Sequence, residues 1–458
     1  MSSAVRPSTV PAGDAEHAEV PRTLAEPAPR ALGVLDQLGL WGNLGVSLLG
    51  FTGALVVLQP GGPGTARLSL AAALLATVVG TVLGAAAVAV SALPGAQTGA
   101  PAMVLLRGLF GARPSWVPTV LNVVQMIGWG TFELVTIATA AGEVAPGFPR
   151  WGYVLVGGAL TTLLAVRPLG AVRVLRRYVT AAVVVALVYL FVQLLRHPLP
   201  SFTDGSWSGF STGVDTTLAV AISWVPMAAD YARHSRSPRA AVTGAFVGYS
   251  VTQVACYALG LVALTTVAAD ADHVFAAFIA VPLGTVAFAV LAARELDQSF
   301  ANVYSTTVST QALRPTWDRR WISVVVGVTV TVLALAVDIY GYASFLSLIG
   351  SVFVPMFAVL VVDWFVLGGR RSWDLSATAR PRWAMLLPWA AGFVMYQLIY
   401  PGTVRWWADA WTSVADAVGF TARPWMSASL FSFVVAAVVT LLVGGLPRLV
   451  AVRRADRA

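Results

Sequence analysis

The sequence predicts an all-α integral membrane protein with 12 transmembrane helices. Of its 458 residues, 57% are hydrophobic and only 11% are charged, whereas about a quarter of the residues of a soluble domain are charged. Apolar stretches long enough to cross a bilayer as helices recur between residues 38 and 447. Segments rich and poor in arginine alternate along the chain, as the two sides of a membrane require. A lipid bilayer is therefore the first expected partner.

The predicted elements follow one another in a simple order. Residues 1–37 are polar and rich in proline, which predicts a disordered cytoplasmic tail. Residues 38–447 form the predicted transmembrane domain, and residues 448–458 form a second cytoplasmic tail. The spans are expected near residues 38–58, 68–91, 116–141, 151–167, 178–196, 213–231, 240–266, 283–311, 321–338, 342–367, 383–401 and 425–447.

The placement of arginine orients these spans. The chain has no lysine, so all 29 of its basic residues are arginine. With a cytoplasmic N-terminus, 23 arginines lie in cytoplasmic segments, 5 lie in external segments and Arg294 lies within a span. Because positive charge gathers on the cytoplasmic side, the sequence predicts a multi-pass plasma-membrane protein with both termini in the cytoplasm. The same placement explains the net charge of +8 without a nucleic-acid partner.

Two spans carry residues that interrupt a helix. Span 1 contains Gly45 and Ser47 within a glycine-rich run, and span 6 contains Pro226. Proline leaves backbone carbonyl groups in need of other partners, and transporter sites often lie where two matched helices unwind. Since the breaks stand five spans apart, they predict two inverted repeats with discontinuous helices 1 and 6. The repeats cover residues 38–196 and 213–367, and two appended helices lie in residues 383–447.

Three spans carry residues that suit a binding site. In span 3, Trp129 and Glu133 stand four residues apart and share one helical face; a carboxylate inside a membrane is costly and marks a functional hypothesis. Trp129 and Trp224 lie too deep to be interfacial anchors, so their rings are expected to hold a planar ligand between them. Span 8 is denser in polar residues, which predicts that it lines a cavity: it contains Arg294, Glu295, Asp297, Gln298, Ser299 and Asn302.

Enzyme chemistry has no support in the sequence. The phosphate-binding loop of an ATP-driven pump needs a lysine, which the chain lacks. The four histidines do not cluster and Cys256 is the single cysteine, so no metal site, cofactor or nucleophilic centre is expected. A sensor would need a folded soluble domain, which residues 1–37 are too short and polar to form. An intramembrane enzyme or a sensor is therefore only a remote alternative to a transporter.

Four short motifs follow one another in an order that is itself informative. They are residues 94–99 (PGAQTG), Gly128-Trp129 with Glu133, Ser223-Trp224-Val225-Pro226, and Asn302-Val303-Tyr304-Ser305. Together they resemble the nucleobase:cation symporter family 1, in its purine–cytosine permease branch. The resemblance implies a five-plus-five inverted-repeat fold that imports a nucleobase or a related heterocycle by cation symport with alternating access. It also implies that aromatic rings matching Trp129 and Trp224 stack on the substrate, and that its polar edge is bound by Glu133, Gln298, Ser299 and Asn302.

Two positions depart from the family pattern. Relatives often carry an amide at the position of Glu133, so a carboxylate here alters substrate choice or adds a proton site. Sodium-coupled relatives place hydroxyl residues early in span 8, where this chain has Arg294 and Glu295. Because an arginine repels sodium and a carboxylate can carry a proton, we expect proton coupling through Glu295 or Glu133. Sodium is the less favoured ion.

Several substrates are compatible with these residues. Cytosine, adenine, guanine and uracil all offer planar hydrogen-bonding edges, and allantoin, a hydantoin or a vitamin precursor is the alternative on the same scaffold. An amino-acid carrier should offer a free helix N-terminus to the substrate carboxylate and few acidic side chains, so Glu133 disfavours it. No sequence pattern bears on the oligomeric state.

Overall fold

The structure is a computed structural model that describes residues 19–60, 65–174, 178–268, 274–337, 342–423 and 425–455. Within these ranges the chain is helical, and isolated bridges between Leu32 and Ser235 and between Leu68 and Ser206 are its only β pairing. The all-α class predicted from the sequence is confirmed.

The helices follow the apolar stretches of the sequence. In chain order they are α1 (Val34–Leu44), α2 (Leu48–Leu58), α3 (Leu70–Thr98), α4 (Ala102–Phe110), α5 (Trp116–Val144), α6 (Arg150–Val166), α7 (Pro168–Val174), α8 (Thr180–Leu194), α9 (Phe210–Ile222), α10 (Ala228–Ala232), α11 (Pro238–Thr243), α12 (Tyr249–Thr266), α13 (Val274–Ala280), α14 (Gly284–Arg294), α15 (Leu296–Leu313), α16 (Arg319–Ala336), α17 (Tyr342–Val361), α18 (Gly369–Ser372), α19 (Leu386–Ile399), α20 (Arg405–Ala417) and α21 (Ala428–Ala455). Short 3-10 turns cover Val225–Met227 and Trp383–Met385, and π turns cover Gly244–Gly248 and Val362–Val366.

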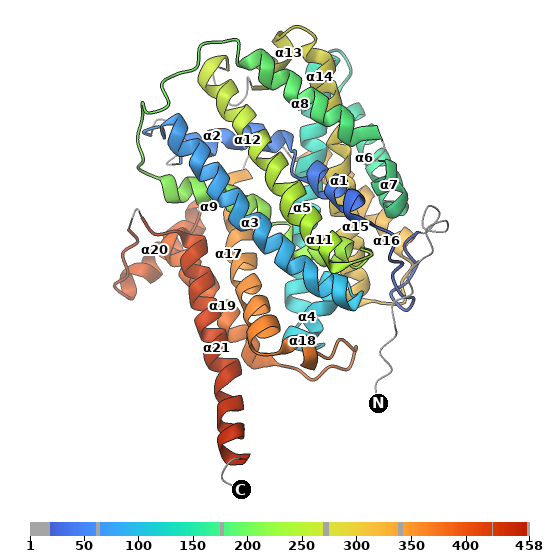
Figure 1. The fold of residues 1–458 in the computed structure, drawn as a ribbon, viewed down its shortest axis with the longest axis vertical. Coiled ribbons are helices and arrows are strands. Elements are labelled where there is room, and N and C mark those ends of the chain that lie inside the picture. Colours follow the sequence, from blue (N-terminus) through green and yellow to red (C-terminus); the bar gives the residue numbers. More distant parts are fainter. Residues whose placement is uncertain are drawn as a thin grey trace.

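The helices pack into one bundle with a separate pair at its side. α5 packs along α15 and α3 packs along α9, while α19 pairs with α21. This last pair lies at one side of the molecule, and α21 extends beyond the other helices (Figure 1). α21 continues as a helix to Ala455, so residues 448–455 prolong the last helix; the prediction that they form a cytoplasmic tail stays a prediction.

Length and hydropathy single out fewer membrane-crossing helices than twelve. Within the described ranges, six helices are long and apolar enough to cross a bilayer, and two bent helix pairs raise the number to eight. Other predicted spans fall on helices that are short, such as α8, or divided, such as α9 and α10. The count of twelve and the inverted repeats therefore stay predictions.

Interruptions are present in both spans where they were predicted. α1 and α2 are separated by residues 45–47 and differ in direction by 50°. α9 ends at Ile222, and Pro226 lies in a single 3-10 turn before α10. α12 passes so close to the first break that a β-carbon at Gly45 would lie 2.7 Å from the carbonyl oxygen of Tyr249. Only glycine permits this approach of two backbones.

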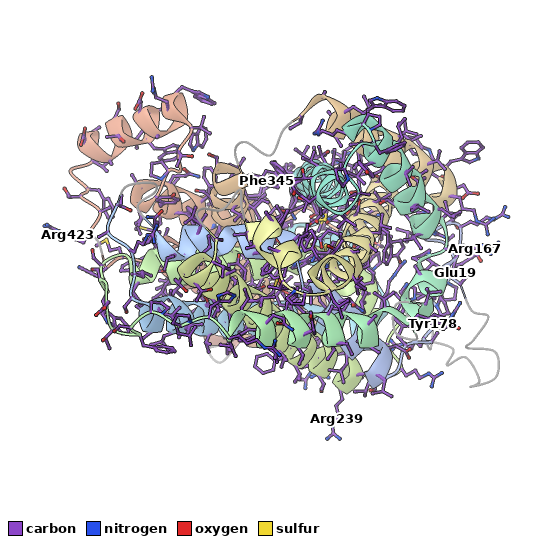
Figure 2. The ribbon with its side chains drawn as sticks, turned by 90° about the horizontal axis from the view of Figure 1, so that it is seen from above. Glu19, Arg167, Tyr178, Arg239, Phe345 and Arg423 are labelled. Carbon is purple, nitrogen blue, oxygen red and sulfur yellow. The ribbon has the colours of Figure 1, made fainter. Side chains whose placement is uncertain are left out.

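The segment 19–33 is ordered, which corrects the predicted disorder of residues 1–37 for the part that the structure describes. The carboxylate of Glu19 accepts hydrogen bonds of 3.0 and 3.1 Å from two backbone N–H groups at the start of α7, near Arg167 at one edge of the molecule (Figure 2). The buried guanidinium of Arg319 donates to the carbonyl oxygens of Val20, Pro21, Ala165 and Val166. These partners come from distant parts of the chain, so local composition could not reveal them.

The same segment is fastened to the end of α10 through His234. The Nδ1 atom of this buried ring donates to the carbonyl oxygen of Pro29 at 3.0 Å, and Nε2 accepts from Arg233 Nε at 3.2 Å. Only a neutral imidazole can make both bonds, since a carbonyl accepts and a guanidinium donates. Burial, with a smaller effect of the neighbouring Arg233 charge, lowers the pKa of His234 well below its ordinary value.

We expect acid to destabilise the wild-type protein more than a His234→Asn variant. An unfolded histidine binds a proton below its ordinary pKa of about 6.5, whereas the native ring stays neutral, so stability falls as the pH drops below that value. Asparagine keeps a side-chain N–H for Pro29 but does not titrate. The check is the unfolding temperature of both detergent-purified proteins between pH 7.5 and pH 5.5; parallel curves would contradict the assignment.

Candidate functional site

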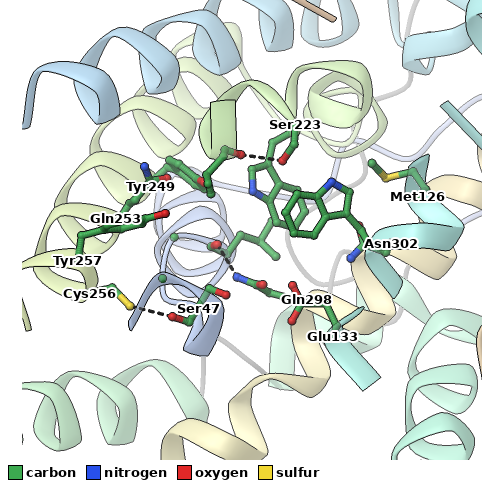
Figure 3. Close-up of a pocket in the computed structure, with 16 residues that line it drawn as sticks. Ser47, Met126, Glu133, Ser223, Tyr249, Gln253, Cys256, Tyr257, Gln298 and Asn302 are labelled. Atoms are coloured by element: carbon green, nitrogen blue, oxygen red, sulfur yellow. Dashed lines mark hydrogen bonds between the residues drawn. The ribbon is translucent and has the colours of Figure 1, made fainter. Parts of the chain in front are cut away.

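Both helix breaks border one enclosed cavity (Figure 3). Its free volume is about 20 Å³, room for a single water molecule, so its walls must move apart to admit a planar ring. The lining side chains and backbone come from the end of α1, from the two breaks and from α2, α5, α9, α12 and α15. They belong to Leu44, Gly45, Ser47, Gly50, Met126, Trp129, Glu133, Val220, Ser223, Trp224, Tyr249, Gln253, Cys256, Tyr257, Gln298 and Asn302.

Polar side chains replace the backbone hydrogen bonds that are lost at the first break. Gln298 Nε2 donates to the carbonyl oxygens of Leu44 and Val46 at 2.7 and 2.8 Å. On the other side of the break, Ser47 caps α2, and Glu295 Oε1 accepts from the Leu48 N–H at 3.2 Å. The ends of a helix leave such groups without intrahelical partners. Residues of α15 and of the turn before it thus hold the broken helix in place.

Arg294 completes this arrangement with its charge. Its guanidinium donates to the carbonyl oxygen of Val46 and lies 2.9 Å from Glu295 Oε2 and 3.0 Å from Asp297 Oδ1. The side chains of Arg294 and Glu295 are fully buried and that of Asp297 is 2% exposed. Arg294 and Asp297, which stand three residues apart in the sequence, thus form a buried ion pair. One cation faces two carboxylates, which leaves an excess of negative charge if all three groups are ionised.

Glu133 adds a third carboxyl group to the cluster. It projects from α5, is buried, and its carboxyl group lies next to that of Glu295. Two carboxylates cannot bond to each other without a proton, because neither has a donor. Close carboxylates repel each other, so a proton held by one of them would stabilise the pair. Glu133 Oε2 is buried and receives no hydrogen bond from a donor of the described residues.

The two predicted aromatic residues both reach the cavity. Trp129 and Trp224 are each 6% exposed and come from different elements, α5 and the break after α9. The ring of Trp129 meets Phe345 edge-on, with centroids 5.4 Å apart. Next to Trp224, the carbonyl oxygen of Ser223 accepts a 3.4 Å hydrogen bond from Gln125 Nε2. A neighbouring ring thus packs on the indole of Trp129, and a side chain of α5 binds the backbone just before Trp224.

The polar residues predicted on span 8 separate into groups. Asn302 and Gln298 border the cavity, although the amide nitrogen of Gln298 is engaged by the first break. Ser299 is buried but is not among the lining residues, so its predicted substrate contact has no support in this geometry. It points elsewhere because successive helical residues are rotated by about 100°, and Gln298 and Asn302 already define the face toward the cavity.

Sequence reasoning missed the wall that α12 provides. Tyr249, Gln253, Cys256 and Tyr257 all line the cavity, and the Cys256 thiol donates to the carbonyl oxygen of Ser47. Span 7 has no break and no charge, so it drew no attention. The signal was the spacing of Tyr249, Gln253 and Tyr257 at i, i+4 and i+8, which puts a polar stripe on one face of an apolar helix.

Comparison with known proteins places the chain in a family. A family profile described as "Permease for cytosine/purines, uracil, thiamine, allantoin" matches residues 39–380, three quarters of the sequence. The chain belongs to this permease family. It is a membrane transporter for nucleobase-like substrates and not an enzyme, as its residues and their resemblance predicted. A comparison with curated protein sequences gives no match.

Solved structures of transporters share the fold of this permease. The closed form of Mhp1 with bromovinylhydantoin bound, a nucleobase-cation-symport-1 family transporter, matches with a TM-score of 0.71 and 14% identity over 93% of this chain and 94% of that chain. The inward-facing form of Mhp1 matches with a TM-score of 0.64 and 14% sequence identity, over 98% of this chain and 95% of that chain. MhsT in complex with L-phenylalanine matches with a TM-score of 0.55 and 14% sequence identity, over 90% of this chain and 97% of that chain.

A metal ion needs several ligating side chains gathered at one point. In the part of the chain that the structure describes, no group of three His, Cys, Asp or Glu side chains is placed to hold a metal ion. The chemistry that the cavity offers is hydrogen bonding, aromatic stacking and, through its carboxyl groups, proton exchange.

Proposed function

We propose that this permease imports a nucleobase-like heterocycle across the plasma membrane by symport with protons. The substrate would bind in the cavity between the two helix breaks, and the protein would alternate between outward and inward access. In this proposal the two repeats, residues 38–196 and 213–367, surround the cavity and both termini are cytoplasmic. The observation that carries it is the joint placement of two indoles and a carboxyl pair at the breaks.

The aromatic residues suit a planar ring. Trp129 and Trp224 stand on separate elements, so a movement that separates these elements opens a slot between aromatic surfaces. A ring stacks on an aromatic side chain regardless of its substituents, and each base contributes about 1–3 kcal/mol by alanine substitution in single-strand binding proteins. Specificity then has to come from hydrogen bonds at the edge, where Glu133, Gln298 and Asn302 are available.

The arginine at the first break favours a proton over sodium. A sodium site at a broken helix uses unwound backbone carbonyl oxygens. Here the carbonyl oxygens of Leu44 and Val46 accept from Gln298, and Val46 also accepts from Arg294. A fixed guanidinium at this position repels a second cation. In this proposal, a proton held by Glu133 or Glu295 is the mobile charge instead.

The contacts at the first break disfavour an amino acid as the substrate. Such a carrier would bind the substrate carboxylate at a free helix N-terminus, but the N-terminus of α2 is already occupied by Glu295 and Ser47. Other heterocycles stay possible, and the family description itself names thiamine and allantoin beside the nucleobases.

The direct test is uptake into proteoliposomes with an imposed gradient. The panel would contain radiolabelled cytosine, adenine, guanine, uracil and allantoin, each offered with an inward proton gradient or an inward sodium gradient. Accumulation of one compound under the proton gradient alone is the expected result. Accumulation that needs sodium would overturn the coupling proposal, and no uptake of any compound by folded protein would overturn the substrate proposal.

Trp224→Ala should lower uptake of the transported base at least about fivefold. The reason is the loss of one stacking surface, worth about 1–3 kcal/mol. Trp224→Phe, which keeps an aromatic face, should retain most of the uptake. Trp383→Ala is the matched control, because Trp383 is 58% exposed and is not among the lining residues. Unchanged initial rates for Trp224→Ala at equal membrane amounts would remove the stacking role.

A further inference from the structure

Gln253 of α12 holds an unused hydrogen-bond acceptor at the cavity. The side chain is 1% exposed and belongs to the lining residues. Its amide nitrogen donates to Thr81 Oγ1 and to the carbonyl oxygen of Thr217, both at 2.9 Å. Its amide oxygen, Gln253 Oε1, is buried and has no partner in the protein. Such orphaned acceptors are rare in folded proteins because their desolvation is costly.

The orientation of this amide is fixed by its neighbours. A backbone carbonyl can only accept, so the atom facing the Thr217 oxygen must be the nitrogen, and the oxygen cannot take its place. Neither Thr81 nor Thr217 lines the cavity. The nitrogen therefore points away from the cavity toward α3 and α9, which leaves the oxygen on the cavity side.

A second unused acceptor lies across the cavity. Glu133 Oε2 is buried and without a partner, and in Figure 3 Glu133 and Gln253 lie on opposite sides of the space between them. Both atoms need an N–H or O–H from something that enters the cavity. A ligand with a donor on one edge would satisfy one of them and leave the other buried and unpaired.

We propose that Gln253 determines specificity by accepting a hydrogen bond from the substrate edge opposite to Glu133. This rests on the proposed function and narrows it: the carried ring has N–H donors on two opposite edges. Hypoxanthine, adenine and cytosine have this pattern, with a ring or amino N–H at each end. A ring that is methylated at the nitrogen facing Gln253 offers no donor and places a methyl group against the amide oxygen.

The test combines a protein variant with N-methylated ligands. Binding to purified protein would be measured for hypoxanthine, 1-methylhypoxanthine and 9-methylhypoxanthine, and for cytosine and 1-methylcytosine. In the wild type, methylation at the nitrogen facing Gln253 should weaken binding about tenfold or more. In Gln253→Leu the parent base should bind about tenfold more weakly, and its methylated form should bind within about twofold of the parent. This loss of discrimination is the coupling that a double-mutant cycle measures.

A matched variant separates recognition from packing. Thr81→Val removes one anchor of the amide nitrogen but leaves the Gln253 oxygen, so discrimination between parent and methylated base should persist. If Gln253→Leu discriminates as the wild type does, the specificity role is overturned while the transport function stands. If the wild type binds neither base nor its derivatives, the proposed substrate class fails and the inference fails with it.

Discussion

Arg294→Met is expected to abolish transport and to cause a large loss of stability. The substitution leaves Glu295 and Asp297 buried without their cation, since both lie within 3.0 Å of the guanidinium. Removing one partner of a buried ion pair costs about 3–5 kcal/mol. It also removes the donor to the carbonyl oxygen of Val46 at the first break. The measurement is the unfolding temperature in detergent, together with uptake by reconstituted protein.

Two further variants make this expectation specific to the cluster. Arg320→Met changes an exposed arginine at the start of α16 and should alter stability by less than about 0.5 kcal/mol. The double variant Arg294→Met with Asp297→Leu removes one of the abandoned carboxylates and should recover part of the lost stability without recovering transport. If Arg294→Met unfolds at the same temperature as Arg320→Met, the guanidinium does not neutralise the cluster.

The helix breaks were predictable because their causes are local. Glycine near residue 45 and proline at 226 change backbone hydrogen bonding wherever they occur in a membrane helix, and both spans are indeed interrupted. The aromatic residues beside them, Trp129 and Trp224, could be recognised from depth and motif. Local sequence thus carried most of the information about where the cavity lies.

The contacts within the site were less accessible, because they join helices that are distant in the sequence. The proximity of Glu133 and Glu295 depends on α5 packing along α15, which no spacing within either helix reveals. Gln253 belongs to an uninterrupted span, and only the fold shows that its amide oxygen faces the cavity. The composition of residues 19–33 predicts disorder, because it does not reveal the contacts with Arg319, almost three hundred residues away, that order this segment.

Glu133→Gln should uncouple transport from the proton gradient. Under the proposed function, the neighbouring carboxyl groups of Glu133 and Glu295 hold one proton in the wild type, and symport requires that this proton be bound with substrate and released on the other side. Glutamine keeps the shape and can still hydrogen-bond to Glu295, but it cannot take up or release the proton. We expect accumulation driven by an inward proton gradient to fall at least tenfold, while exchange of external for internal substrate continues.

The two assays must be run on the same proteoliposomes, because exchange reports substrate binding and access without net proton movement. Glu143→Gln is the control on the same helix, since Glu143 is exposed near the end of α5 and is absent from the cavity lining; it should behave as the wild type in both assays. Exchange that is lost together with accumulation would assign Glu133 to substrate binding alone. Undiminished accumulation by Glu133→Gln would mean that Glu295, and not Glu133, carries the transported proton. The Glu295→Gln variant then tests this assignment by the same pair of measurements.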